Sequence, residues 1–406
     1  MGRFSGRNQA ARRRIPAQLG RAASDEALLV FWGDVRCGFS FWAALPECGA
    51  PCRREPQLLF FRLLPRLSTL LRKAAVFLAA ACAAAAQAPR ISDINYYGLH
   101  KVTAEKIQAA AGLKKGGELV ASKGAIEDEI AKIPGVVLAR VEALCCEGAS
   151  VELFIGIEEK GAPHPSLHFA PAGDAALPKE LLETYGDFLA AVARAATRGN
   201  ITEDMSAGYS MMDDPEARAY QPRFRTFAAE HFEWLREVLR NSADANQRAV
   251  AAAVIGYGAD KQQAVGELQY AVGDPDGAVR SNAMRALTAL AVYASRQPGP
   301  SVRIAPTWLV EMLHSIVLED RLQAARTLVA LTDSPNPAAL ELMRERALDS
   351  LEEMARWTTL RFALPAFLLL GRVAGIPDGE IHAQWESGDR EAVIGKALAL
   401  EPPTRR

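Results

Sequence analysis

The sequence contains few histidines and cysteines, and it lacks the short motifs that most often carry enzyme chemistry. The patterns G-x-x-x-x-G-K-[ST], G-x-G-x-x-G, H-E-x-x-H and G-x-S-x-G do not occur, and residues 87–406 contain no C-x-x-C. Their absence excludes the common phosphate loop, dinucleotide fingerprint, zinc-protease helix and serine-hydrolase elbow. We therefore expect that the protein is not an enzyme, holds no metal or cofactor, and has no small-molecule substrate.

Cysteine usage argues against a disulfide framework. Four of the six cysteines precede residue 87, which leaves only Cys145 and Cys146 in the rest of the chain. Adjacent cysteines rarely bond each other, because the eight-membered ring strains the peptide. We interpret the pair as two small residues that end a strand; redox or metal chemistry is the alternative.

The formal net charge of −1 averages two unlike parts of the chain. Residues 1–86 contain 13 Lys and Arg against 5 Asp and Glu, whereas residues 87–406 contain 34 against 43, which is a formal charge of −9. An acidic body repels phosphate backbones and anionic lipid. We therefore expect neither nucleic acid nor a membrane surface as a partner.

Residues 1–66 do not have the pattern of a folded domain. Before Arg72 there are eleven Arg and no Lys, and no helical or strand period is sustained. We interpret this segment as a disordered leader or as a gene start placed too far upstream, with Leu67 as the true first residue. A membrane-inserting hairpin is the alternative.

Residues 67–86 have the pattern of a secretory signal peptide. Arg72-Lys73 is the positive region, Ala74 to Ala85 is the apolar region, and Ala84-Ala85-Ala86 is a small-residue cleavage site. The apolar run is well short of the ~20 residues that span a bilayer. We therefore expect export to the periplasm or cell envelope of a bacterium. Membrane association would then require lipidation of Cys82, whose flanking residues only faintly resemble a lipoprotein box, or a membrane-bound partner.

Residues 87–161 alternate between strand and helix patterns in the order β-α-α-β-β. A strand ends at Gly98, Thr103 and Gly112 bracket a first helix, and Pro134-Gly135 stops a second helix. Two strands follow, joined by a hairpin loop at Cys146–Ala149. Alternation in the last strand places Val151, Leu153, Ile155 and Ile157 inward and Glu152 and Glu158 outward.

This module resembles a POTRA domain, the polypeptide-transport-associated module of outer-membrane assembly and division proteins. The resemblance covers about seventy residues. It rests on Ile94, Tyr96, Gly98, Thr103, Ile107, Leu113, Gly116-Gly117, Ile133-Pro134-Gly135-Val136 and the closing strand to Lys160. It implies that the second strand is a free edge that can take an extended polypeptide. The partner-binding residues would be Val136, Val137, Leu138, Arg140, Glu142 and Leu144.

Residues 162–178 are predicted to be a solvated linker, because their prolines cannot sustain a helix or a central strand. His164 and His168 lie within it, and the prolines exclude a helical metal site there. From Lys179 onward the period is 3.6 with no convincing strand, first in a helical region over 179–240. Within it, Asp214-Pro215-Glu216 is interpreted as a helix start, with calcium binding as the alternative.

Residues 241–400 contain an internal repeat with a terminal cap. Arg248, Arg280 and Arg321 are each followed by an alanine three residues later and by an aliphatic residue seven residues later. The second arginine lies 32 residues after the first, and the third lies 41 residues after the second. The stretch Gly273–Leu287 resembles the HEAT-repeat signature. That resemblance implies a structural ladder of Asp and Arg between neighbouring repeats, formed by Asp244, Arg248, Asp276, Arg280 and Arg321.

The expected fold class is therefore α+β: a small POTRA-like domain and an all-α HEAT-like solenoid, after a signal peptide. Stacked helix pairs present a long protein-binding face, so we expect an interaction scaffold for a protein or polypeptide partner. Two alternatives remain at this point. One is a lyase-type enzyme, because some HEAT-like proteins resemble lyases that act on bilins, and the other is a structural envelope protein that associates with itself.

Overall fold

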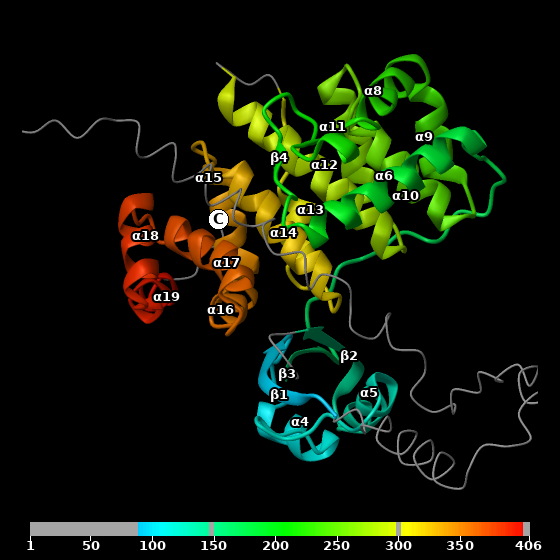
Figure 1. Cartoon of the computed structure of the whole chain (residues 1–406). Coiled ribbons are helices and arrows are strands. Elements are labelled where there is room, and N and C mark those ends of the chain that lie inside the picture. The colour runs from blue at the N-terminus through cyan, green and yellow to red at the C-terminus, as the bar shows by residue number, and fades with distance from the viewer. Residues whose placement is uncertain (1–87, 146–149, 298–301, 401–406) are drawn as a thin grey trace, which may run out of the picture.

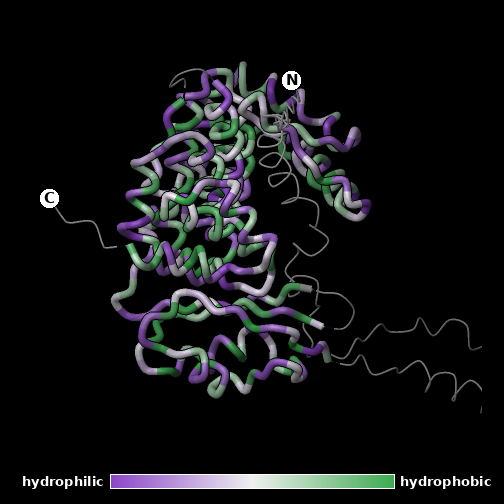
Figure 2. The backbone as a smooth tube through the Cα atoms, turned by 90° about the vertical axis from the view of Figure 1, so that its left-hand side faces the viewer, coloured by the Kyte–Doolittle hydropathy of each residue, from purple (hydrophilic) through white to green (hydrophobic). Residues whose placement is uncertain are grey.

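The computed structural model describes residues 88–145, 150–297 and 302–400. They form a small α/β module below a larger helical half, as two perpendicular views show (Figure 1, Figure 2). Three predicted features lie outside the described residues: the leader at 1–66, the signal peptide at 67–86 with Cys82, and the hairpin loop at Cys146–Ala149.

The α/β module has the predicted order of elements. It runs β1 (Arg90–Tyr97), α4 (Ala104–Ala111), α5 (Lys123–Ala131), β2 (Val136–Cys145) and β3 (Ser150–Glu159). Helix α4 ends at Gly112, whose φ of 64° places it in the left-handed region that favours glycine. The side chain of Ser122 caps α5 by accepting the backbone N–H of Ala125.

The three strands form one mixed sheet in the order β1-β3-β2. Strand β3 is central, parallel to β1 and antiparallel to β2. Helices α4 and α5 cover one face of this sheet, where Ile107, Ile126 and Ile130 pack against the inward residues of β2 and β3. The alternation that the sequence predicts for β3 is confirmed on this face.

The second face of the sheet is not exposed to solvent but packs on the helical half. The Phe154 ring makes edge contacts with Trp357, at 5.2 Å between ring centres, and with Phe362, at 5.6 Å. The Trp357 Nε1–H donates to the carbonyl of Tyr96, 3.1 Å away. Glu152, which the alternation places on the outward face, accepts the hydroxyl of Thr358 there. The module is therefore held in one orientation by a second core.

The segment between the module and the helices lies extended along the helical half. The N–H of His168 donates to the carbonyl of Gly273 at 2.7 Å, and that of Gly173 donates to the carbonyl of Asn241 at 2.8 Å. The ring of His168 stacks on Tyr270, with 4.5 Å between ring centres. The prediction of a solvated linker is therefore wrong for His168, since these contacts tie the segment to two neighbouring repeats.

Before the repeats, the helical half has a long helix and a short irregular region. Helix α6 (Lys179–Thr197) is followed by two two-residue strands in an irregular stretch, where the sequence predicted no strand. The Asp214 carboxylate accepts the N–H groups of Glu216 and Ala217, which confirms the predicted helix start. The elements are β4 (Glu203–Asp204), β5 (Met211–Met212), α7 (Pro215–Arg218), α8 (Gln221–Glu230) and α9 (Phe232–Asn241).

The repeats form two rows of stacked helices. Helices α10, α12, α14 and α17 pack in sequence in one row, while α11, α13 and α15 pack against them from a second row. Helices α18 and α19 pack on α17 as the predicted terminal cap. The bounds are α10 (Ala245–Ile255), α11 (Lys261–Ala271), α12 (Gly277–Arg296), α13 (Thr307–Met312), α14 (Leu318–Leu331), α15 (Pro337–Arg346), α16 (Leu348–Ala355), α17 (Leu360–Val373), α18 (Asp378–Ser387) and α19 (Arg390–Leu398).

Helix α17 carries the most apolar run of the repeats and is buried against its neighbours, including at Pro365. Among the described residues, no helix is long and apolar enough to cross a membrane.

Candidate polypeptide-binding edge

Strand β2 lies at one edge of the sheet and pairs only with β3. The opposite edge is partly covered by the chain itself. There the N–H of Ile91 donates to Gly117, the N–H of Gly116 donates to Ile91, and the N–H of Leu119 donates to Pro89. Among the described residues, β2 is therefore the edge whose outer side pairs with no further strand, as the sequence resemblance implies.

The backbone of β2 alternates in direction, and one hydrogen bond shows which groups point outward. The N–H of Val141 donates to the Oε1 atom of Glu127 on α5, 2.8 Å away, so it does not face β3. In an antiparallel pair, residues whose N–H and C=O groups face the partner alternate with residues whose groups face away. The outward residues are therefore Ala139, Val141 and Ala143.

The direction of these backbone groups differs from the prediction for part of the partner-binding set. Arg140, Glu142 and Leu144 were expected to bind a partner, but their backbone groups face β3. The residues that offer outward backbone groups were missed, because nothing in the sequence tells which of two alternating sets bonds the inner neighbour. Ala139, Val141 and Ala143 are buried as whole residues, main chain included.

The side chains at the start of β2 form a small apolar surface. The register shifts between Val136 and Leu138, so Val137 is an extra residue in the ladder. Val137 is 57% exposed and Leu138 37% exposed, the two exposed large apolar side chains of this strand. Val136 and Leu144 are half-buried, and Arg140 is exposed. An apolar bulge beside outward backbone groups suits an extended segment that carries an apolar residue.

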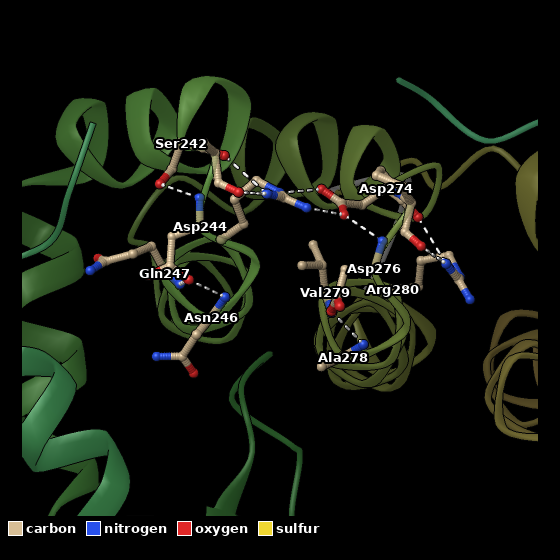
Figure 3. Close-up of polar contacts among 12 residues, drawn as sticks. Ser242, Asp244, Asn246, Gln247, Asp274, Asp276, Ala278, Val279 and Arg280 are labelled. Carbon is tan, nitrogen blue, oxygen red and sulfur yellow. Dashed lines mark hydrogen bonds and ion pairs between the residues drawn. The ribbon is translucent and has the colours of Figure 1, made fainter. Parts of the chain in front are cut away.

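The predicted arginine ladder is present within the helical repeats. Arg248 on α10 donates from Nε and Nη2 to the two carboxylate oxygens of Asp274, at 2.8 and 2.9 Å, and both side chains are buried. Its Nη1 donates to the carbonyls of Ser242 and Ala243. Figure 3 shows Asp274 in the loop between α11 and α12. One guanidinium thus joins its own loop to the next repeat.

Arg280 repeats this arrangement one unit further. Its Nε and Nη2 donate to Asp320, with a shortest distance of 2.8 Å, and its Nη1 donates to the carbonyls of Asp274 and Pro275. Bidentate pairing of this kind is geometrically specific. Both pairs are buried, so removal of either partner would leave the other as an uncompensated buried charge.

The acidic partners in the ladder differ from the predicted ones. Asp244 and Asp276 are not rungs: each caps the helix that it precedes. The Oδ1 of Asp244 accepts the N–H of Asn246 at 2.8 Å, and that of Asp276 accepts the N–H of Ala278 at 2.9 Å. The true partners are Asp274 and Asp320. Asp274 lies two residues before the helix cap Asp276, in the sequence Gly-Asp-Pro-Asp-Gly. The sequence alone does not distinguish which of these two aspartates pairs with an arginine.

Arg321, the third predicted rung, connects the repeats to the α/β module instead of to another aspartate. Its guanidinium lies over the ring of Tyr97 in β1, 4.8 Å from the ring centre, and 3.5 Å from the carboxylate of Glu353. Glu353 in turn accepts the N–H groups of Gly98 and Leu99. Burial raises the pKa of Glu353, while Arg321 and the two N–H groups act in the opposite direction.

A serine–histidine pair beside this interface bears on the enzyme alternative. The Oγ of Ser350 is 3.0 Å from Nδ1 of His314, and Nε2 of His314 is 2.8 Å from the carbonyl of Arg346. Because a carbonyl only accepts, Nε2 carries the proton and Nδ1 accepts from the serine. Burial and Arg321 lower the pKa of His314. The lowered pKa keeps the imidazole neutral, and Ser350 is buried.

The described residues contain no group of three or more His, Cys, Asp or Glu side chains arranged to hold a metal ion. Residues 232–328, which extend from the start of α9 into α14, match the family model of HEAT repeats. No curated protein matches the chain. The C-terminal region is therefore a helical repeat scaffold of a kind that can mediate protein interactions, and the POTRA likeness of residues 87–161 stays a prediction.

Proposed function

We propose that this chain is an exported scaffold of the bacterial cell envelope. In this proposal the module over 87–161 is a POTRA-like domain that holds an extended polypeptide at the free edge of β2. The HEAT repeats fix the module in place and offer a second protein-binding surface. The partner is a protein, since the acidic body disfavours nucleic acid.

The observation that carries this proposal is that β2 pairs with only one strand of the sheet, in a module that is packed on the repeats. A strand that pairs on one side offers N–H and C=O groups to another chain. The aromatic contacts of Phe154 and Trp357, together with the Glu353 hydrogen bonds, hold the sheet on the repeats. A peptide bound at β2 would therefore keep a defined position relative to the solenoid. Export rests on the pattern at 67–86.

Two proline variants one residue apart test the edge. Ala139→Pro removes an outward donor and is compatible with an edge position. Arg140→Pro removes a donor that faces β3 and should destabilise the module, because a ladder hydrogen bond is lost. A photo-crosslinker at Val137 in native cells reports partner binding, and one at Lys115, beside the opposite edge, is the control.

We expect the crosslinker at Val137 to capture a protein and the crosslinker at Lys115 to capture none. The Val137 crosslink should be lost in the Ala139→Pro variant, although the thermal unfolding of this variant stays close to that of wild type. An unchanged crosslink at Val137 in folded Ala139→Pro would exclude strand addition at this edge.

A further inference from the structure

The segment that connects the two halves, residues 164–177, lies on the repeats as a bound extended peptide would. The N–H of His168 donates to the carbonyl of Gly273 at 2.7 Å. Five residues later, the N–H of Gly173 donates to the carbonyl of Asn241 at 2.8 Å. The two acceptors are equivalent, because each stands seven residues before an arginine of the ladder. The same backbone carbonyl in two successive repeats therefore accepts from this segment.

The contacts at both carbonyls leave no room for a Cβ atom. A Cβ on Gly173 would lie 2.5 Å from the carbonyl oxygen of Asn241. A Cβ on Gly273 would lie 2.8 Å from Nε2 of His168. Both distances are well below the roughly 3.5 Å of an ordinary van der Waals contact. A peptide in this place therefore needs a glycine opposite Asn241, and the repeat needs a glycine beside the bound ring.

The ring of His168 fills a place that an apolar aromatic ring would suit better. It stacks on Tyr270, with 4.5 Å between ring centres, and meets Trp308 at 6.2 Å. Its Nδ1 atom is buried and, within the part of the chain that the structure describes, has no hydrogen-bond partner. A buried polar atom without a partner opposes binding, because it has lost water and gained nothing. The chain's own segment is therefore a weaker ligand than this site allows.

The segment can leave the repeats without disturbing their core. None of residues 164–176 is fully buried, and Phe169, next to the bound ring, is 99% exposed. Its far end is held by the Nε1–H of Trp234, which donates to the carbonyl of Ala176 at 2.9 Å. Segments with few buried contacts open locally at a small part of the global free energy of unfolding. A competing peptide can therefore replace residues 164–177 while the helices stay folded.

We propose that the carbonyls at the ends of α9 and α11, together with the rings of Tyr270 and Trp308, form a polypeptide-binding site that residues 164–177 occupy as an intramolecular ligand. The partner is an extended segment with an apolar aromatic side chain and, five residues later, a glycine. It binds by displacing the chain's own segment. This inference rests on the proposed function only where that function gives the repeats a protein-binding surface, and it does not involve β2.

The first arm of the test follows a fluorescent peptide with the sequence of residues 164–177 by fluorescence anisotropy. The full chain should bind it weakly, because the tethered segment competes at a high effective concentration. His168→Ala in the chain removes the ring contacts of that competitor and should tighten peptide binding about tenfold. His164→Ala is the matched control: its exposed ring lies against the carbonyl of Ala162, so the affinity should stay that of wild type.

The second arm changes only the peptide and uses the His168→Ala chain throughout. A peptide with His168→Phe should bind about tenfold more tightly than the parent peptide, because no ring nitrogen is buried without a partner. A peptide with Gly173→Ala should lose binding, because its Cβ would collide with the carbonyl of Asn241. Since these substitutions leave the protein unchanged, their effects cannot come from altered folding of the repeats.

Each departure from these results overturns a defined part of the proposal. Equal affinity of wild type and His168→Ala would show that residues 164–177 do not occupy the peptide site. Equal affinity of the parent and Gly173→Ala peptides would show that the peptide binds elsewhere. A His168→Phe peptide that binds no more tightly than the parent would refute the aromatic partner. Absence of binding by every peptide would refute the site, while strand addition at β2 would still be decided by the Val137 crosslink alone.

Discussion

The guanidinium of Arg321 lies over the ring of Tyr97, so that the third arginine of the repeat contacts the first strand of the α/β module. The two residues are far apart in the sequence, and the hydroxyl of Tyr97 also donates to the carbonyl of Ile316, 2.9 Å away. Burial raises the pKa of Tyr97, so the hydroxyl stays protonated and donates. The ladder that organises the repeats thus also anchors the module that carries the candidate edge.

The buried rungs should be far more important for stability than exposed ion pairs. Arg248→Ala and Arg280→Ala should each lower the free energy of unfolding by about 3–5 kcal/mol, because an aspartate is left buried without its cation. Arg236→Ala removes an exposed pair with Glu233 and should cost less than about 1 kcal/mol. Chemical denaturation measures all three. If one arginine variant lost function while stability stayed near wild type, a catalytic role would replace the structural one.

Two aspartates that are two residues apart should behave differently. Asp276→Ala removes a helix N-cap and should cost about 1 kcal/mol. Asp274→Ala leaves Arg248 without its buried partner and should cost about 3 kcal/mol or more. Denaturation of the two variants under the same conditions compares them. Equal losses would contradict the assignment of Asp276 as a cap and Asp274 as a rung.

Truncation of Trp357 should release the module from the helical half. Trp357→Ala removes the edge contact with Phe154 and the hydrogen bond to the carbonyl of Tyr96. We expect a larger radius of gyration by small-angle scattering, with helical circular dichroism retained. Trp385→Ala is the matched control, because Trp385 packs on Phe367 instead. Equal radii of gyration in wild type and Trp357→Ala would show that this contact does not hold the module.

Glu159 should make the stability of the module depend on pH. Burial alone would raise its pKa, but the N–H groups of His100, Lys101 and Val102 outweigh burial and lower the pKa below its ordinary value of 4.5. The stability that this carboxylate contributes is therefore fully present above pH 4.5 and is lost as the pH falls through the lowered pKa.

We expect Glu159→Gln to be about 2 kcal/mol less stable than wild type at pH 7, and this difference to shrink below pH 4.5. Denaturant titrations at a series of pH values measure it. Glu158→Gln is the control, since the three N–H groups donate to Glu159 and not to its neighbour. A difference that stayed constant down to pH 3 would mean that these hydrogen bonds do not favour the ionised form.

Export predicts where the native chain begins. The pattern at 67–86 places the first residue of the exported protein near Gln87. N-terminal sequencing of protein isolated from native cells should recover that end. Recovery of peptides from residues 1–60 would refute both the cleavage and the interpretation of the leader.

Much of the local structure follows from the sequence alone. The β-α-α-β-β order, the helix start at Asp214 and the end of α4 at Gly112 depend on caps and on hydrophobic period, which act within a few residues. The spacing of Arg248, Arg280 and Arg321 likewise marks three equivalent helix positions. These signals are local, so they predict the elements without knowledge of which elements pack together.

Tertiary structure decided which groups meet. Arg248 pairs with Asp274, 26 residues away, and Arg280 with Asp320, 40 residues away, because a buried guanidinium bonds the carboxylate that the next repeat brings to it. The sequence placed Glu152 outward but could not show that this face packs on Trp357 and Thr358. Nor could it show that Val141 points its N–H at Glu127, since alternation determines two faces of a strand but not which set of amides bonds the neighbour. The local period therefore determined the elements, and the packing of distant elements determined the ladder and the edge.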